Sequence, residues 1–185
     1  MPVENMNNEF DIQPDLSQTR KFLQAVIGTS DQICFQTFRS RPGQNIEPKW
    51  RFGTLRDCAE WLTRDNRRGA GVYFVVNYCD GAGRSASNVT RVRALFVDLD
   101  GSPVEPLIDN ELQPHVIIES SPGRYQAFWR CKNVGLGEFT PVQKALIARF
   151  RADPACKDLG RVMRLPGFWH LKKEPFLCRI HFYNL

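Results

Sequence analysis

The chain lacks the features that would place it in a membrane or mark it for secretion. No apolar run approaches the roughly 18 residues of a spanning helix, and no signal peptide opens the sequence. It also lacks a phosphate-binding G-x-x-x-x-G-K-[S/T] loop and a dinucleotide-binding glycine fingerprint. These absences argue against a P-loop nucleotidase and a Rossmann oxidoreductase. We therefore expect a cytoplasmic protein with no membrane partner.

Metal-binding cysteine motifs are absent as well. The six cysteines never form C-x-x-C, and none stands at zinc-ligand spacing from one of the three histidines. Several of the cysteines lie inside apolar runs. We expect them to be buried free thiols in a reducing compartment, not disulfides or zinc ligands.

The charge balance is basic. The net charge is +5 and the isoelectric point about 9.0, and arginines recur along most of the chain. A basic surface of this kind fits a polyanionic partner, either a nucleic acid or a nucleotide.

The hydrophobic pattern predicts a mixed α/β (α+β) fold. Helical spacing begins at Ser17, after Thr54 and at Thr140, where Thr140, Pro141 and Gln143 resemble a capping box. Apolar runs of strand composition alternate with these helices, at Ile33–Phe38, Val72–Val76, Ala94–Val97, His115–Ser120, Arg124–Arg130 and Cys178–Tyr183. We expect 157–170 to be a basic loop. The second half follows a β-α-β-β-α-β plan if 102–114 contains a short helix.

The most informative stretch is the apolar strand Ala94–Val97, which runs directly into Asp98 and Asp100. Side chains alternate along a strand, so the two carboxylates are predicted to share one face, roughly 7 Å apart. They would repel one another unless a cation lay between them, and hard divalent cations prefer carboxylate oxygens. The alternative is a solvated turn, for which D-x-D-G is ordinary chemistry.

A second group of polar residues follows the last helix. Asp158 is a candidate third carboxylate, although by itself a loop acid paired with Arg161 or Lys157 is the favoured interpretation. Arginine forks match phosphate oxygens in pairs, so Arg161 and Arg164 suit a triphosphate. A solvated basic loop is the other interpretation. His170 and Lys172 lie in the same segment and could contact phosphate.

The predicted hairpin turn at 120–124 is rich in small residues. Its backbone N–H groups, with Ser121 and Arg124, could bind an anion. The strand after it carries Tyr125, Phe128 and Trp129, which could stack on bases. Core packing is the favoured interpretation for the last two.

Taken together, three motifs resemble those of the archaeo-eukaryotic primase superfamily. They are F-V-D-L-D-G, E-S-S-P-G-R-Y-Q-A-F-W and K-D-L-G-R-V-M-R-L-P-G-F-W-H-L-K, in that order between about Val72 and Lys173. Within the superfamily the chain looks most like the RepB-type primase domains of plasmids, phages and other mobile elements, which include primase-polymerases.

The resemblance implies a primase fold with an RRM-like catalytic half and an N-terminal α/β lobe. It implies Asp98, Asp100 and Asp158 as ligands of Mg²⁺ or Mn²⁺. It also implies a phosphate-contacting end that carries Arg164, His170 and Lys172. Two positions depart from the family pattern: Gln126 replaces a histidine that contacts the triphosphate in many relatives, and His170 stands where relatives often have asparagine.

These observations lead to the hypothesis of a primase or primase-polymerase, a nucleotidyltransferase acting on single-stranded DNA with nucleoside triphosphates. Arg161 joins the predicted triphosphate site, Ser121 or Arg124 could replace the missing histidine, and Asn77 and Arg84 are further candidates near the active strand. The alternatives are a non-catalytic single-stranded nucleic-acid-binding module and a metal-dependent nuclease. A nucleotide-dependent product would distinguish the polymerising enzyme from both.

We expect a flexible arm at 1–14 and one catalytic domain at 15–185. Within that domain, about 15–90 would form the N-terminal lobe and 91–185 the RRM-like lobe. A replicative helicase or a further domain outside this chain is a possible partner.

Overall fold

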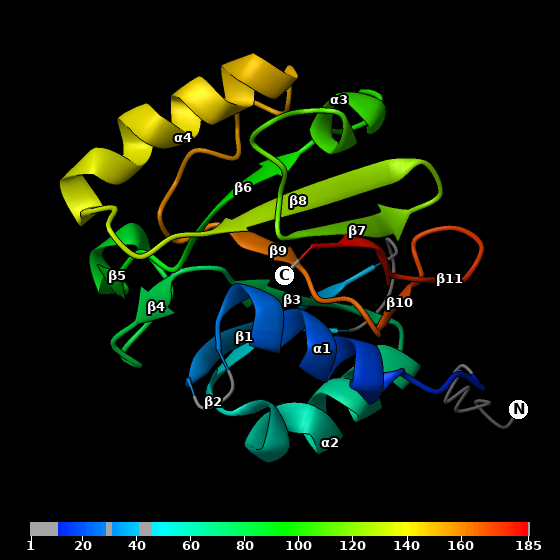
Figure 1. Ribbon diagram of the computed structural model, residues 1–185. Helices are drawn as coiled ribbons and strands as arrows, with labels where there is room; N and C mark the ends of the chain where they lie inside the picture. The colour runs from blue at the N-terminus through cyan, green and yellow to red at the C-terminus, as the bar shows by residue number, and fades with distance from the viewer. Residues whose placement is uncertain (1–10, 29–30, 41–45, 185) are drawn as a thin grey trace, which may run out of the picture.

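Two four-stranded antiparallel sheets dominate the computed structural model, which describes residues 11–28, 31–40 and 46–184. The expected mixed α+β fold is confirmed. In the N-terminal sheet the strand order is β2 (Lys49–Gly53), β1 (Ile33–Arg39), β3 (Ala70–Val75) and β9 (Val162–Arg164). The strand β9 comes from the segment predicted to be a loop, and it pairs with β3 at the edge of this sheet. The two halves of the sequence are therefore interleaved in space (Figure 1).

The C-terminal sheet has the order β12 (Arg179–Tyr183), β7 (Val116–Ser121), β8 (Arg124–Arg130) and β6 (Ala94–Asp98). A short helix, α3 (Glu105–Ile108), connects β6 to β7, as the β-α-β-β-α-β plan requires. The strand that follows the last helix, β9, belongs to the N-terminal sheet instead. The closing strand β12 then pairs with β7, at the edge opposite β6.

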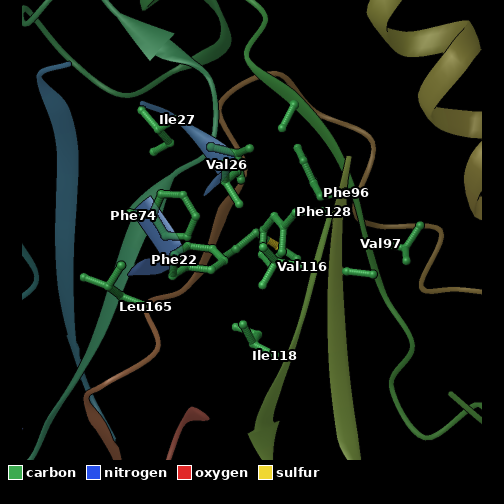
Figure 2. Close-up of a cluster of buried hydrophobic side chains, with 14 of the residues drawn as sticks. Phe22, Val26, Ile27, Phe74, Phe96, Val97, Val116, Ile118, Phe128 and Leu165 are labelled. Atoms are coloured by element: carbon green, nitrogen blue, oxygen red, sulfur yellow. The ribbon is translucent and has the colours of Figure 1, made fainter. Parts of the chain in front are cut away.

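The helix α1 (Leu16–Val26) lies between the sheets and joins their cores. Asp15 caps its N-terminus by accepting from the backbone N–H groups of Ser17 and Gln18. The ring of Phe22 meets Phe74 of the N-terminal sheet at 5.4 Å and Phe128 of the C-terminal sheet at 5.0 Å, both edge to face (Figure 2). One hydrophobic cluster thus spans both sheets.

The helix α2 (Leu55–Arg67) begins where the sequence predicts. Thr54 and Asp57 form a reciprocal capping box, in which each side chain accepts from the other's backbone N–H. Thr37 of β1 donates to Asp65 at 3.3 Å, and the guanidinium of Arg51 lies over the ring of Trp61 at 5.0 Å. These contacts attach α2 to the face of the N-terminal sheet that also meets α1.

The helix α4 (Leu136–Phe150) begins earlier than the sequence pattern suggests. The predicted cap at Thr140 is wrong, because Gly135 is the N-cap and the carboxylate of Glu138 accepts from its N–H at 2.8 Å. Pro141 lies inside the helix. Gln143 is fully buried, and its amide bonds the backbone N–H and C=O of Phe96 and the carbonyl of Cys156. This side chain satisfies the free edge of β6, where no further strand pairs.

Two short hairpins complete the fold: β4 (Tyr78–Cys79) with β5 (Val89–Arg91), which flank the 3₁₀ turn η1 (Ala86–Asn88), and β10 (Trp169–His170) with β11 (Phe176–Leu177). All six cysteines are free, and all but the half-buried Cys131 are buried. No helix among the described residues is long and apolar enough to cross a membrane.

The expected flexible arm at 1–14 lies largely outside the described residues. Its last part is attached to the domain. Arg67 donates to the carbonyl of Ile12 at 3.1 Å, and the indole N–H of Trp169 donates to the carbonyl of Gln13 at 2.9 Å. Residues 12 and 13 thus contact the domain, and the flexibility of the arm stays a prediction.

Candidate active site

Asp98 is the last residue of β6 and lies opposite Gln126 on β8. Residues opposite each other in an antiparallel pair share a face, and here the shared face is that of Phe128, which looks toward the N-terminal sheet. The side chain of Gln143 fixes the same strand from its open edge. The position of this carboxylate is therefore set from both sides of the strand.

The electrostatic environment of Asp98 is unfavourable for a carboxylate. Burial raises the pKa of Asp98, and the charges of Asp100 and Asp153 raise it further. Only neutral amides oppose the effect: Gln126 Nε2 donates to Asp98 Oδ2 at 2.7 Å, and the Asp100 N–H donates to Asp98 Oδ1 at 3.2 Å. No Arg or Lys salt bridge involves Asp98 among the described residues. Such a group favours an arriving positive charge.

Asp100 lies just beyond the strand, in a left-handed conformation with φ of 42°. The strict alternation expected from the sequence therefore stops at Asp98. Arg124 Nη1 donates to Asp100 Oδ1 at 2.7 Å. A Cβ at Gly101 would lie 2.7 Å from the same Nη1, so the absence of a side chain at Gly101 makes room for the guanidinium.

Gln126 connects the two sheets at this point. Its Nε2 donates to Asp98, and its Oε1 accepts from the backbone N–H of Arg164 on β9 at 3.1 Å. Gln126 is only 6% exposed, so both bonds are largely shielded from water. The Gln126 side chain therefore joins the motif that contains Asp98 to the motif that contains Arg164, although the two motifs are far apart in the sequence.

His170 lies beside two basic residues, Arg164 and Lys172. His170 Nδ1 lies 3.2 Å from the carbonyl oxygen of Ser120, which can only accept, so Nδ1 carries the proton. Burial, with the charges of Arg164 and Lys172, lowers the pKa of His170 to about 4. His170 is thus neutral near pH 7. The positive charge predicted here for phosphate binding therefore comes from Arg164 and Lys172, not from His170.

The hairpin turn between β7 and β8 is held by Glu119. Its Oε1 accepts from the Gly123 N–H at 3.1 Å, and its Oε2 accepts from Arg179 at 2.8 and 3.0 Å. Ser121 lies opposite Arg124 across this turn. The hairpin therefore presents Arg124 toward Asp100 on an ordered support.

The structure separates the predicted third acid from the first two. Asp158 is exposed and pairs with Arg161 at 2.8 Å, the alternative that the sequence left open, and Arg161 also donates to the carbonyl of Ala155. Asp153, which the sequence reasoning missed, is a second acid, after Asp100, whose charge acts on Asp98. Its backbone N–H donates to the Asp98 carbonyl at 2.8 Å.

The other candidates have different surroundings. Asn77 is fully buried, accepts from the Arg93 N–H at 3.0 Å and donates to the Leu159 carbonyl at 3.1 Å, so both ends of its amide are occupied within the fold. Arg84 lies over the ring of Phe38, on the N-terminal sheet. The remaining sequence candidates for base stacking also have partners: Phe128 and Trp129 are core residues, as expected, and Tyr125 packs on His181.

A divalent cation fits the oxygen donors in part. Within the described ranges no three His, Cys, Asp or Glu side chains come together as a ready ligand set. Mg²⁺, however, is usually bound by one or two carboxylates together with substrate phosphates and water. Asp98 and Asp100 can supply such carboxylates, and Asp98 has no cationic partner that a metal would need to displace.

Comparison with known families identifies the class. Residues 82–180 match the RepB DNA-primase N-terminal domain family, and the chain belongs to that family. This range includes the acids at the end of β6, the β7–β8 hairpin and β9. The chain is also 27% identical to Mobilization protein A of Escherichia coli over 133 residues, which is 71% of this chain and 18% of that protein. The chain thus spans less than a fifth of the length of this relative.

Solved structures share the fold. The archaeo-eukaryotic primase domain of the cyanophage S-2L primase-polymerase superposes with a TM-score of 0.76 at 20% identity, covering 94% of this chain and 92% of that one. Primase RepB′ gives 0.70 at 21% identity, covering 91% and 56%. The catalytic domain of RepB′ in complex with initiator DNA gives 0.65 at 20% identity, covering 91% and 84%. The expected archaeo-eukaryotic primase fold is confirmed.

Proposed function

We propose that this domain synthesises primers on single-stranded DNA by nucleotidyl transfer, in the replication of a plasmid, a phage or another mobile element. The proposal rests mainly on one observation. Gln126 connects Asp98, beside Asp100, to β9, where Arg164 begins the R-L-P-G segment. Acids and bases that the family motifs carry in separate parts of the chain are thereby in one place.

Each residue has a separate role in this proposal. Gln126 orients Asp98, and Glu119 supports the hairpin that brings Arg124 to Asp100. Arg164 and Lys172 provide positive charge for the triphosphate, and neutral His170, which bonds the Ser120 carbonyl, supports this group. Ser121 lies next to this group and could donate to a phosphate oxygen. Arg161 is better explained as the partner of Asp158.

Asp98 and Asp100 would hold Mg²⁺ or Mn²⁺, with substrate phosphates completing the ligand set. Such ions, when bound, activate an attacking oxygen and stabilise a leaving one in phosphoryl transfer. Asp153 is better supported than Asp158 as a third acid, because its charge acts on Asp98 while Asp158 is paired with Arg161. Among the described residues, its own carboxylate accepts from the Ala155 N–H, at 2.8 Å, and from the Cys156 thiol, at 3.7 Å.

The partners in this proposal are a single-stranded DNA template and nucleoside triphosphates. A replicative helicase or a further domain would act with the chain in a longer protein. A non-catalytic DNA-binding module accounts for the basic charge but leaves unexplained the half-buried carboxylate of Asp98, which has no salt bridge among the described residues. A nuclease shares the acids, yet has less use for Arg164 and Lys172 beside His170.

The direct test is synthesis on single-stranded DNA from labelled nucleotides with Mg²⁺ or Mn²⁺. Wild type is compared with Asp98→Asn/Asp100→Asn, and Asp80→Asn serves as a control in an exposed acid of the β4–β5 loop. We expect a nucleotide-dependent product from wild type and from the control, and none from the double variant.

Two results would contradict the proposal. Template cleavage that needs metal but no nucleotide would identify a nuclease. DNA binding without any product, equal in wild type and the double variant, would identify a binding module.

A further inference from the structure

One row of side chains crosses the N-terminal sheet on the face away from α1 and α2. The strand register places Trp50 opposite Gln36, Gln36 opposite Tyr73, and Tyr73 opposite Arg164. Directly opposed residues share a face, so these four side chains lie side by side across β2, β1, β3 and β9. Phe74, which meets α1, points to the other face because side chains alternate along β3.

The neighbouring row on the same face is covered. Cys34 and Val75 form a buried cluster with Cys79 and Val89 of the β4–β5 hairpin, and Phe52 and Val162 pack against its rim. Cys34 lies opposite Phe52, and Val75 opposite Val162, which places them one step along the strands from the first row. The β4–β5 hairpin therefore covers one end of the face, and the row that contains Trp50 lies beyond that cluster.

Two aromatic rings with a guanidinium group over each lie beyond that cluster. The guanidinium of Arg164 lies 4.8 Å from the ring centre of Tyr73, and that of Arg84 lies 5.7 Å from the ring centre of Phe38. The two rings meet edge to face at 5.3 Å. Gly71 lies opposite Phe38, and a Cβ there would come within 2.9 Å of the Tyr73 ring. A glycine is needed for the Tyr73 ring to lie so close to the sheet.

We name this surface the aromatic platform and define it by six residues: Gln36, Phe38, Trp50, Tyr73, Arg84 and Arg164. Trp50 is 42% exposed, while Trp61 and Trp129 are 3% and 5% exposed. Phe38 and Tyr73 are half-buried. Gln36 Oε1 is buried and finds no hydrogen-bond partner in the described structure. One exposed ring beside two half-buried rings indicates a surface that a partner can cover.

We propose that the aromatic platform binds unpaired bases of single-stranded DNA, the template in the function proposed above. Rings stack on bases of any sequence, and Arg84 adds positive charge for the phosphates of the strand. None of the six residues is acidic. Duplex DNA is a poor match because its bases are already stacked on one another. The inference rests on the proposed function, because it gives that function the surface that holds its template.

The platform is continuous with the candidate active site. Arg164 contributes its side chain to the platform and its backbone N–H to Gln126, which in turn bonds Asp98. A strand lying on Tyr73 would therefore arrive next to the acids. The sequence candidates for stacking, Phe128 and Trp129, cannot serve because both are buried in the core.

The test measures binding of a labelled oligothymidine by fluorescence anisotropy, in EDTA and without nucleotides. The variants are Phe38→Ala and Trp50→Ala, with Phe38→Leu and Trp50→Leu to retain apolar volume. Tyr183→Ala is the matched control, because this ring lies under Lys21 at 4.2 Å on the other sheet. Loss of one stacking ring is expected to weaken binding about 5- to 100-fold. Tyr183→Ala should bind within about twofold of wild type.

Two further measurements sharpen the result. Oligothymidine should quench tryptophan fluorescence in wild type, and most of this quenching should disappear in Trp50→Phe. Replacement of Arg84 by glutamine should weaken binding and lower the slope of log affinity against log salt by about one. Melting curves verify that each variant is folded.

The outcomes separate this inference from the proposed function. Unchanged affinity in folded Phe38→Ala and Trp50→Ala overturns the platform, even if the wild type makes primers. A defect of equal size in Tyr183→Ala overturns it as well. Weak binding confined to the platform variants supports it, and it does so even if wild type makes no product, in which case only the proposed function fails.

Discussion

Gln126 donates from Nε2 to Asp98 Oδ2 at 2.7 Å, although these residues are 28 positions apart on neighbouring strands. The opposite end of the same amide accepts from the backbone of Arg164. A glutamine can do both because its amide has a donor and an acceptor on one planar group. A carboxylate of the same shape could not donate to Asp98.

Replacing Gln126 should therefore affect both stability and activity. Gln126→Met keeps the size of the side chain but removes the partners of the Arg164 N–H and of Asp98 Oδ2, at a cost of about 1–3 kcal/mol in the free energy of unfolding. Gln126→Glu should be worse for synthesis, because it adds a second negative charge beside Asp98. Urea unfolding and the primer-synthesis assay measure the two effects. Wild-type stability and activity in both variants would contradict the link.

The charged carboxylate of Asp98 should lower the free energy of unfolding although primer synthesis requires it. Because burial and acidic neighbours raise its pKa, the charged form destabilises the fold at pH values above that pKa. Asp98→Asn in EDTA should thus be as stable as wild type or up to about 1 kcal/mol more stable, and it should make no primers. Glu111→Gln, at an exposed acid, should change neither property. An Asp98→Asn protein that is less stable by more than 1 kcal/mol would contradict this account.

Asp153 and Asp158 can be compared directly, since they lie five residues apart in one loop. Asp153→Asn should reduce primer synthesis by about tenfold or more, because an acidic charge that acts on Asp98 would be lost. Asp158→Asn should reduce it only a few-fold, because an exposed pair with Arg161 contributes roughly 0–1 kcal/mol. The ratio of the two rates, with Mn²⁺ titrated, decides between them. The reverse order would restore Asp158 as the third acid.

The acids at the end of β6 could be predicted from the sequence because they depend on local information. An apolar run followed by D-L-D-G identifies a strand end, and Thr54 with Asp57 identifies a helix start in the same way. Local information also misled at Thr140. There Thr-Pro resembles a helix start, but the helix already begins after Gly135, whose backbone N–H donates to the carboxylate of Glu138.

The remaining parts of the site depend on contacts between distant strands. β9 is three residues long, too short for a periodic signal, and it joins a sheet whose other strands lie about 90 or more positions earlier. Its register alone brings Arg164 beside Tyr73. Nothing in the run V-Y-F-V-V says whether Tyr73 or Phe74 faces the core, so the platform could not be recognised before the sheet was known.

His170 should make the protein sensitive to mild acid. The pKa of His170 is about 4 in the fold against an ordinary value near 6.5, so between these values the unfolded chain binds a proton that the folded chain does not. Stability should therefore fall as the pH drops from 6.5 toward 4.

Replacing this residue isolates the effect. His170→Asn removes the titrating group, so the variant should lose less stability than wild type between pH 7 and pH 5. The difference should be of the order of 1 kcal/mol, because partial exposure screens the charge. Urea unfolding of both proteins at pH 7, 6 and 5 measures it, and His181→Asn, at an exposed histidine, is the control. Parallel stability curves for wild type and His170→Asn would mean that the pKa of His170 is the same in the folded and the unfolded chain, and would contradict this account.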